Sequence, residues 1–163
     1  MKNTLKYSFI LFAAALTFAG CQTESKRMDE HHFDNKLYLN ASNAADEILV
    51  KQTGSTVTVS RTLSISTALQ TDCEVTAKLV AAPELLSVYK QSYYNDDAII
   101  LPEGKCEIAE STLKINKGAN ASPEVEISFN GLEELDRELV YVQPVKLADV
   151  QGIDVLESKT VVY

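Results

Sequence analysis

The feature that most constrains this chain is a period of two in its apolar residues, which begins at Lys36 and continues toward the C-terminus. Apolar and polar side chains alternate in residues 57–65, 75–79, 113–115 and 125–129. Because successive side chains of a strand point to opposite faces, each run predicts a strand with one buried and one solvated face. Strands of this kind suit antiparallel sheets that pack on one another.

Further short apolar runs extend the predicted sheets. They occupy residues 36–39, 48–50, 139–142 and 160–163, and they are rich in β-branched and aromatic side chains. Together the runs predict an all-β domain, an antiparallel β-sandwich of about seven strands.

Glycine and proline predict where the strands are interrupted. Residues 117–120 lie between two alternating runs and predict a hairpin loop, in which Gly118 adopts a positive φ. Pro123 precedes a strand, where the missing N–H does no harm. Pro144 falls inside the apolar run of residues 140–147, so we expect an edge position or a bulge there.

One segment departs from the period of two and predicts a short helix over residues 84–94. Pro83 is a favoured first helical residue, and Glu84 lies in the first turn, where the helix dipole favours an acid. The side chains at helical spacing are Leu85, Val88, Tyr89 and Ser92. We expect this helix to bridge the two sheets.

Tyrosines and polar residues gather at the end of this helix, at Tyr89, Tyr93, Tyr94, Asn95 and Asp97. Two interpretations remain open. The tyrosines cap the core of the sandwich, or they form a glycan contact in which the rings stack on a sugar and the polar groups bind its hydroxyls.

The first twenty residues have the pattern of a secretory signal peptide. Lys2 and Lys6 precede an apolar run over residues 7–18, which is shorter than the roughly 20 residues of a transmembrane helix. The run leads into Phe18-Ala19-Gly20-Cys21, which resembles the lipobox of bacterial lipoproteins. We therefore predict lipidation of Cys21, with palmitate among the acyl chains. Several acyl chains on one N-terminus anchor a protein durably.

This signal divides the chain into three parts. Residues 1–20 are the lipoprotein signal peptide, residues 21–35 the lipidated N-terminus with a flexible tether, and residues 36–163 the β-sandwich domain. The tether carries the adjacent His31 and His32, but a metal site needs several converging ligands, so we predict no metal site.

Two cysteines remain beyond the anchor, Cys73 and Cys106. Outside the cytoplasm such a pair can form a disulfide, which would close a loop worth about 4 kcal/mol on the chain-entropy model. The alternative is two separately buried thiols, because free cysteine is commonly buried. The sequence leaves both open.

The charge of the mature chain limits its partners. Removing residues 1–20 takes away two lysines and no acid, which leaves 13 basic against 23 acidic side chains. An acidic surface argues against nucleic acid and against anionic lipid as partners.

The order of several short motifs resembles a domain-of-unknown-function family that forms the N-terminal module of Bacteroidetes surface lipoproteins. The resemblance covers about residues 45–163. Its motifs are Tyr94-Asn95, Leu101-Pro102-Glu103-Gly104, Ile115-Asn116-Lys117-Gly118, Leu135-Asp136 and Tyr141-Val142-Gln143-Pro144-Val145. Asn116-Lys117 replaces Pro-Ala, and Gln143 replaces the usual Leu.

The resemblance implies an immunoglobulin-like β-sandwich that works with outer-membrane glycan-uptake machinery. In most members a second domain follows, either a family 18 glycosidase, a laminin-G-like or concanavalin-like lectin fold, or a discoidin-like module. This chain stops at Tyr163, so we expect either a truncated product or a minimal stand-alone member.

Catalytic motifs are absent from the sequence. It has no GxSxG elbow, Walker loop, HExxH or dinucleotide fingerprint, and it lacks the DxxDxDxE signature of family 18 glycosidases. Its two histidines lie in the tether, which excludes a Ser-His-Asp or Cys-His pair inside the domain. We expect a protein that is not an enzyme and uses no cofactor.

The sequence therefore predicts a non-catalytic β-sandwich module of a cell-surface lipoprotein that serves glycan capture as spacer or interaction domain. One alternative is direct carbohydrate binding, and another is a structural subunit of a surface fibre whose edge strand is completed by a neighbour. The expected location is the outer membrane, lipid-anchored and at the cell surface, because Glu24 gives the segment after Cys21 a likeness to surface-export signals. Glycans and other glycan-uptake proteins are the expected partners.

Overall fold

The computed structural model describes residues 34–51 and 53–163. The predicted signal peptide, the lipidation of Cys21 and nearly all of the tether lie outside the described residues and stay predictions. None of the helices in residues 34–51 and 53–163 is both long and apolar enough to cross a membrane.

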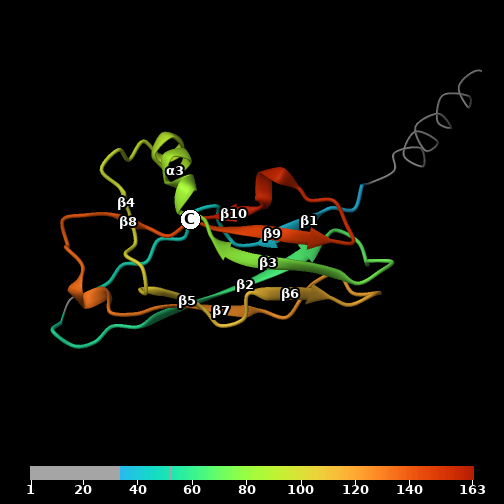
Figure 1. The fold of residues 1–163 in the computed structure, drawn as a ribbon, viewed down its shortest axis with the longest axis horizontal. Helices are drawn as coiled ribbons and strands as arrows, with labels where there is room; N and C mark the ends of the chain where they lie inside the picture. The colour runs from blue at the N-terminus through green and yellow to red at the C-terminus, as the bar shows by residue number, and fades with distance from the viewer. Residues whose placement is uncertain (1–33, 52) are drawn as a thin grey trace, which may run out of the picture. The chain divides into compact units, whose positions relative to one another are not determined.

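Two four-stranded antiparallel sheets form the body of the domain (Figure 1). The first sheet has the order β1-β2-β7-β5 and the second the order β10-β9-β3-β6. The first is built from β1 (Leu37–Asn40), β2 (Val59–Thr67), β7 (Val125–Phe129) and β5 (Cys106–Ile108). The second is built from β10 (Val161–Val162), β9 (Val145–Gln151), β3 (Val75–Ala81) and β6 (Thr112–Ile115).

The smaller elements lie in the connections between these sheets. A parallel pair joins β4 (Ile99–Ile100) to β8 (Tyr141–Val142). Three 3₁₀ turns are η1 (Pro83–Leu85), η2 (Leu132–Glu134) and η3 (Glu157–Lys159), and the one α-helix of the described residues is α3 (Leu86–Tyr93). Figure 1 shows β4 and β8 beyond one end of the long strands.

This topology confirms the predicted fold class. The order β1-β2-β7-β5 corresponds to strands A-B-E-D of an immunoglobulin sandwich, and β3, β9 and β10 correspond to C-F-G. The described residues contain ten strands rather than about seven, because β6 adds an outer strand next to β3 and the pair β4–β8 lies apart from both sheets.

The core follows the predicted alternation. In β3 the side chains of Val75, Ala77 and Leu79 are buried while Lys78 is exposed. The same alternation buries two residues each of β6 and β7, namely Leu113, Ile115, Val125 and Ile127. Because these inward faces come from both sheets, they form one hydrophobic core between the layers.

The second half of β2 does not show the alternating burial of β3, β6 and β7, because it is buried on both faces from Leu63 to Thr67. Its neighbours in the sheet are β1 and β7, and the loop after β6 covers its end. The amide of Thr67 donates to the carbonyl of Asn120 at 2.9 Å, and Ser66 forms an isolated bridge with Ala121.

The predicted helix is confirmed as η1 followed by α3. Pro83 occupies the first turn, and the amide of Ala82 just before it donates to the carbonyl of Pro144 at 2.9 Å. The helix ends at Tyr94, which adopts a left-handed conformation with φ 53° and donates its amide to the carbonyl of Lys90.

Three local predictions were wrong. Residues 48–50 form no strand, and Leu49 is 87% exposed, because this apolar run has no neighbouring strand to pair with. Residues 117–120 are no hairpin loop, because β6 and β7 belong to different sheets, although Gly118 has the expected positive φ of 82°. Pro144 lies neither at an edge nor in a bulge but is fully buried between β8 and β9.

Candidate functional site

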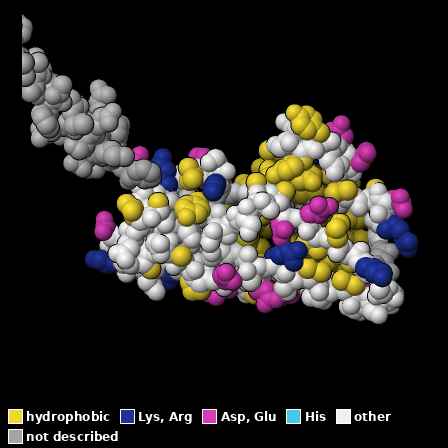
Figure 2. Space-filling view, turned by 180° about the vertical axis from the view of Figure 1, so that it is seen from behind, with side chains coloured by type: hydrophobic (Ala, Val, Ile, Leu, Met, Phe, Trp, Pro, Cys, Tyr) yellow, Lys and Arg dark blue, Asp and Glu magenta, His cyan; other side chains and the backbone are white. Residues whose placement is uncertain are grey.

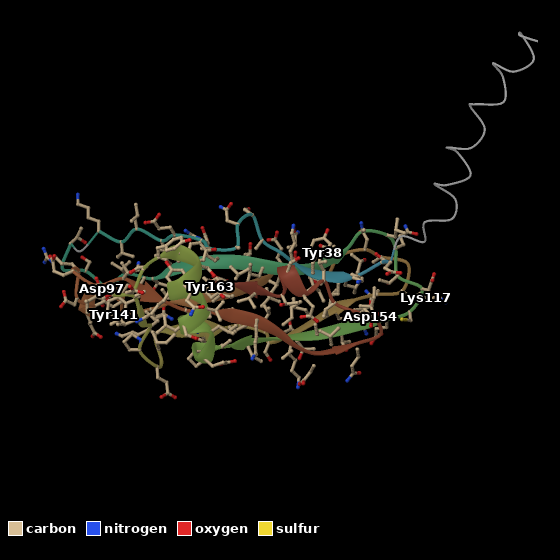
Figure 3. All side chains as sticks on the ribbon, turned by 90° about the horizontal axis from the view of Figure 1, so that it is seen from above. Tyr38, Asp97, Lys117, Tyr141, Asp154 and Tyr163 are labelled. Carbon is tan, nitrogen blue, oxygen red and sulfur yellow. The ribbon has the colours of Figure 1, made fainter. Side chains whose placement is uncertain are left out.

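Three tyrosine rings meet where α3 lies against the C-terminal strand. Tyr89 and Tyr93, one helical turn apart, stack with their ring centroids 4.7 Å apart. Tyr163 joins both, at 5.3 Å from the ring of Tyr89 and 6.0 Å from that of Tyr93. Figure 3 shows Tyr163 next to the helix. Aromatic pairs at these separations stabilise each other beyond the area they bury.

Backbone hydrogen bonds hold Tyr163 in this position. Its amide donates to the carbonyl of Ala44 at 2.9 Å, and its own carbonyl accepts from the amide of Asp46 at the same distance. Burial raises the pKa of the Tyr163 phenol, and the neighbouring Tyr93 raises it further. The neutral phenol is therefore the form that suits the cluster.

The predicted glycan residues separate into two groups. Tyr89 and Tyr93 turn toward each other and toward Tyr163, so these rings hold α3 against the C-terminal strand. Tyr94 is 95% exposed and forms no part of this cluster. A left-handed φ is uncommon for such a bulky side chain, so α3 ends in a costly backbone conformation at this exposed ring.

Asn95 and Asp97 lie in the loop that follows. The amide of Asn95 donates to the carbonyl of Lys90 at 3.2 Å, which continues the helix end. The ammonium of Lys90 donates to the carbonyl of Asp96 at 2.8 Å and ties the loop back to α3. Figure 3 places Asp97 with Tyr141 at one end of the domain, and Lys117 with Asp154 at the other.

Apolar side chains on α3 remain uncovered. Tyr93 is 41% exposed and Val88 is similarly exposed, and with Tyr94 they form what we call the α3 surface. Figure 2 shows hydrophobic atoms gathered on the projection that α3 makes. Ile99 of β4 is also exposed, as are Leu139 and Val140, which directly precede β8.

The two candidate disulfide cysteines are free. Cys73 is exposed just before β3, where its thiol donates to the carbonyl of Gly152, whereas Cys106 is half-buried as the first residue of β5 in the other sheet. The two thiols are therefore unbridged in this structure, and only Cys106 is partly buried. Burial raises the pKa of the Cys106 thiol.

The two adjacent acidic side chains of η2 have structural partners. Glu133 accepts a hydrogen bond from the amide of Val57 at 2.9 Å, which lowers its pKa, and Glu134 pairs with Lys105. Within the described residues, no group of three or more His, Cys, Asp or Glu side chains could hold a metal ion.

Sequence reasoning missed Tyr163 as a member of the tyrosine cluster. The helical spacing of Tyr89 and Tyr93 predicts that these two rings share a face. No local pattern links them to Tyr163, which lies 70 residues further along the chain than Tyr93. Only the fold brings the C-terminal strand under the helix.

Comparison with protein families gives one match, to the family model described as "-like, N-terminal domain", over residues 33–154. No curated protein matches the chain.

Among solved structures, similar folds come from Bacteroides. A Bacteroides ovatus protein to which carbohydrate binding has been ascribed has a TM-score of 0.65 and 19% identity, over 78% of this chain and 35% of that one. A two-domain Bacteroides fragilis protein of unknown function has a TM-score of 0.59 and 11% identity, over 86% and 48%. EndoBT-3987 of Bacteroides thetaiotamicron, solved with a Man5GlcNAc product, has a TM-score of 0.50 and 21% identity, over 63% and 25%.

These likenesses concern the fold. At such low identity they show a shared sandwich and carry no ligand from one protein to another. The chain spans less than half the length of each of these three solved chains.

Proposed function

The chain belongs to the family of N-terminal domains whose model matches residues 33–154, and on that premise we propose that it is a non-catalytic interaction module of a cell-surface lipoprotein in glycan capture. The family resemblance noted in the sequence is confirmed by this match and by the Bacteroides neighbours. The finer elements of the proposal, the lipid anchor at Cys21, the outer membrane and the glycan-uptake partners, rest on the sequence.

The observation that carries the proposal is the α3 surface. It presents Val88, Tyr93 and Tyr94 to solvent, and the ring of Tyr163 supports Tyr93 from the body of the domain. Aromatic residues on a rigid support are enriched at protein interfaces, because they cover a large area and lose little conformational freedom on binding. This surface therefore suits a protein partner. The β-sandwich that carries it then serves as the spacer.

Co-purification of the tagged protein from crosslinked cells tests this proposal. We expect outer-membrane glycan-uptake proteins among the crosslinked partners, and we expect Val88→Asp to weaken their capture, because a charge buried in an apolar contact is costly. Lys114→Ala is the matched control, since Lys114 is an exposed residue of β6 that forms an ion pair with Glu74. Equal capture by the Val88→Asp variant and the wild type would contradict the proposal.

The anchor has its own test. Cells labelled with palmitate are expected to label the wild-type protein and leave the Cys21→Ala variant unlabelled. Protease added to intact cells is expected to digest the wild-type protein from outside. Label retained on the variant would overturn the lipid anchor, and protection until lysis would overturn the surface location.

Direct carbohydrate binding remains the second candidate, and the exposure of Tyr94 favours it. An isolated ring with both faces in solvent can stack on a sugar, and Asn95 and Asp97 follow it with groups that bind hydroxyls. Titration with a panel of host and plant glycans tests this role. Binding that Tyr94→Ala removes supports it, and binding that survives this substitution places the sugar elsewhere.

The fibre alternative needs an open strand edge. At β10 the edge is partly covered, because Tyr163 exchanges backbone hydrogen bonds with Ala44 and Asp46. Assembly through the β10 edge therefore has less support than the other two alternatives.

A further inference from the structure

A concave surface lies on the outer face of the second sheet, at β3, β6 and β9. It is a groove of about 230 Å³, which we call the β3–β9 groove. The residues that line it include Thr76, Lys78, Thr112, Asp149, Val150 and Gln151. Thr76 and Lys78 alternate in β3 with the buried Ala77 and Leu79, so they point away from the core.

A β-bulge shapes this groove. Thr76 pairs with Gln151 and Lys78 with Ala148, so Ala77 alone lies opposite both Asp149 and Val150. Asp149 takes the left-handed conformation with φ 50°, which is the conformation of the first residue of a G1 bulge, a position usually occupied by Gly. Bulges interrupt the ladder and redirect side chains, and they are over-represented next to functional sites.

The redirected side chain forms an ion pair across the groove. The ammonium of Lys78 donates to a carboxylate oxygen of Asp149 at 2.8 Å, and both side chains stay about half exposed. Because an exposed pair contributes little to stability, the unusual backbone at Asp149 is not explained by the strength of this bond. The pair instead leaves a donor and an acceptor fixed side by side at the groove.

The chemistry of the lining selects a class of ligand. Two hydroxyls, one amide and the two members of the ion pair offer both donors and acceptors. The one amine in the lining is already neutralised by Asp149, so an anion finds no unpaired positive charge here. The groove is smaller than the roughly 300–1,000 Å³ of drug-sized ligand pockets, which limits it to one small ring.

We propose that the β3–β9 groove binds a single neutral sugar ring, with the paired Lys78 and Asp149 holding two neighbouring hydroxyls. This goes beyond the proposed interaction module, because the groove shares no residue with the α3 surface. A longer glycan would extend out of the groove at its open side. Because the site is shallow, we expect it to bind sugar with a dissociation constant in the millimolar range.

The test follows backbone amide resonances of the chain while neutral hexoses (glucose, mannose and galactose) are added one at a time. We expect at least one of them to shift the amides of residues 76–78 and 148–151. Asp149→Asn keeps the side-chain shape and tolerates the left-handed backbone, but it removes the charge, so we expect affinity to fall roughly tenfold. Lys78→Met removes the amine and is expected to lower the affinity by a similar factor.

Lys114→Ala is the control, because the Lys114–Glu74 pair is similarly exposed, with a nitrogen to oxygen distance of 2.7 Å, and Lys114 does not line the groove. The Lys114→Ala variant is expected to show the same amide shifts as the wild type when a hexose is added. Glucuronate and sulfate probe the charge argument, and we expect neither to shift these resonances. The proposal is overturned if no hexose shifts them, if both groove variants bind like the wild type, or if the anions bind as well. None of these outcomes depends on the capture of protein partners at Val88, so the two proposals fail separately.

Discussion

The α3 surface and the β3–β9 groove are built in opposite ways. The α3 surface is aromatic, and it is held by contacts between Tyr89, Tyr93 and the distant Tyr163. The groove is polar, and it arises inside the ladder of two paired strands from one extra residue in β9. The comparison teaches that the first surface depends on the docking of the last strand, whereas the second depends only on strand register.

The largest effect in this comparison is expected from deleting residues 160–163. The deletion removes the buried Val162, whose burial contributes about 1.5–3 kcal/mol, and it removes Tyr163 from two ring contacts worth about 0.5–1.5 kcal/mol each. We expect the free energy of unfolding, measured in urea, to fall by about 3 kcal/mol or more. The exposed Glu157→Ala is the control, and its midpoint is expected to match that of the wild type. Equal midpoints for the deletion and the control would mean that β10 does not support α3.

Tyr163→Ala separates the ring from the strand. The half-buried ring contacts both tyrosines of α3, so we expect a loss of about 2 kcal/mol, below the 3–5 kcal/mol of a fully buried aromatic residue. Hydrogen exchange of α3 amides is expected to accelerate, while that of β3 and β9 changes less. Tyr94→Ala is the matched control, because that ring is almost fully exposed. If both variants lose the same stability, the ring cluster does not hold the helix.

The same contrast explains how much the sequence predicts. Alternation in β3, β6 and β7 depends on the local pleat, so the period of two finds these strands and their buried faces. The pair Tyr89 and Tyr93 follows from helical spacing in the same way. Local patterns therefore predict the sandwich, its helix and part of the candidate site.

The rest depends on contacts that no local pattern records. Tyr163 reaches α3 only because β10 pairs with β9, and the groove exists only because β9 carries one residue more than β3 between two ladder pairs. The apolar residues 48–50 show the converse, since an apolar run without a neighbouring strand remains outside the sheets. The assignment of residues 117–120 to a hairpin fails for a similar reason, because loop residues specify a turn but not the partner of the strand that follows.

At the groove side, Gly152→Ala is expected to disturb the end of β9. A Cβ there would lie 2.6 Å from the carbonyl oxygen of Glu74, and φ is 90°, a conformation that costs other residues roughly 1–2 kcal/mol. Gly118→Ala is the matched control, because its φ of 82° is similar and no atom lies within 4 Å of the added Cβ. We expect Gly152→Ala to lose about 1 kcal/mol more than Gly118→Ala in urea unfolding. Equal losses would show that the strand end moves freely and that register alone does not fix the groove.

The smallest effect is expected at alkaline pH, and it again distinguishes the two surfaces. The pKa of the Tyr163 phenol is raised in the folded protein, first by burial and then by Tyr93, so the folded state holds this proton more tightly than the unfolded state. The corresponding stabilisation is fully present below the unfolded pKa of about 10 and is lost as the pH rises through the folded pKa. Tyr163→Phe has no proton to lose at this position and keeps the ring. We therefore expect the free energy of unfolding of the wild type to fall relative to that of Tyr163→Phe as the pH increases from 9 to 11. Because other groups titrate in both proteins alike, the difference between the two curves isolates this phenol. Parallel curves over that range would mean that ionised Tyr163 leaves the ring cluster without cost, and that Tyr163 is held in place by its backbone bonds to Ala44 and Asp46 rather than by its ring contacts.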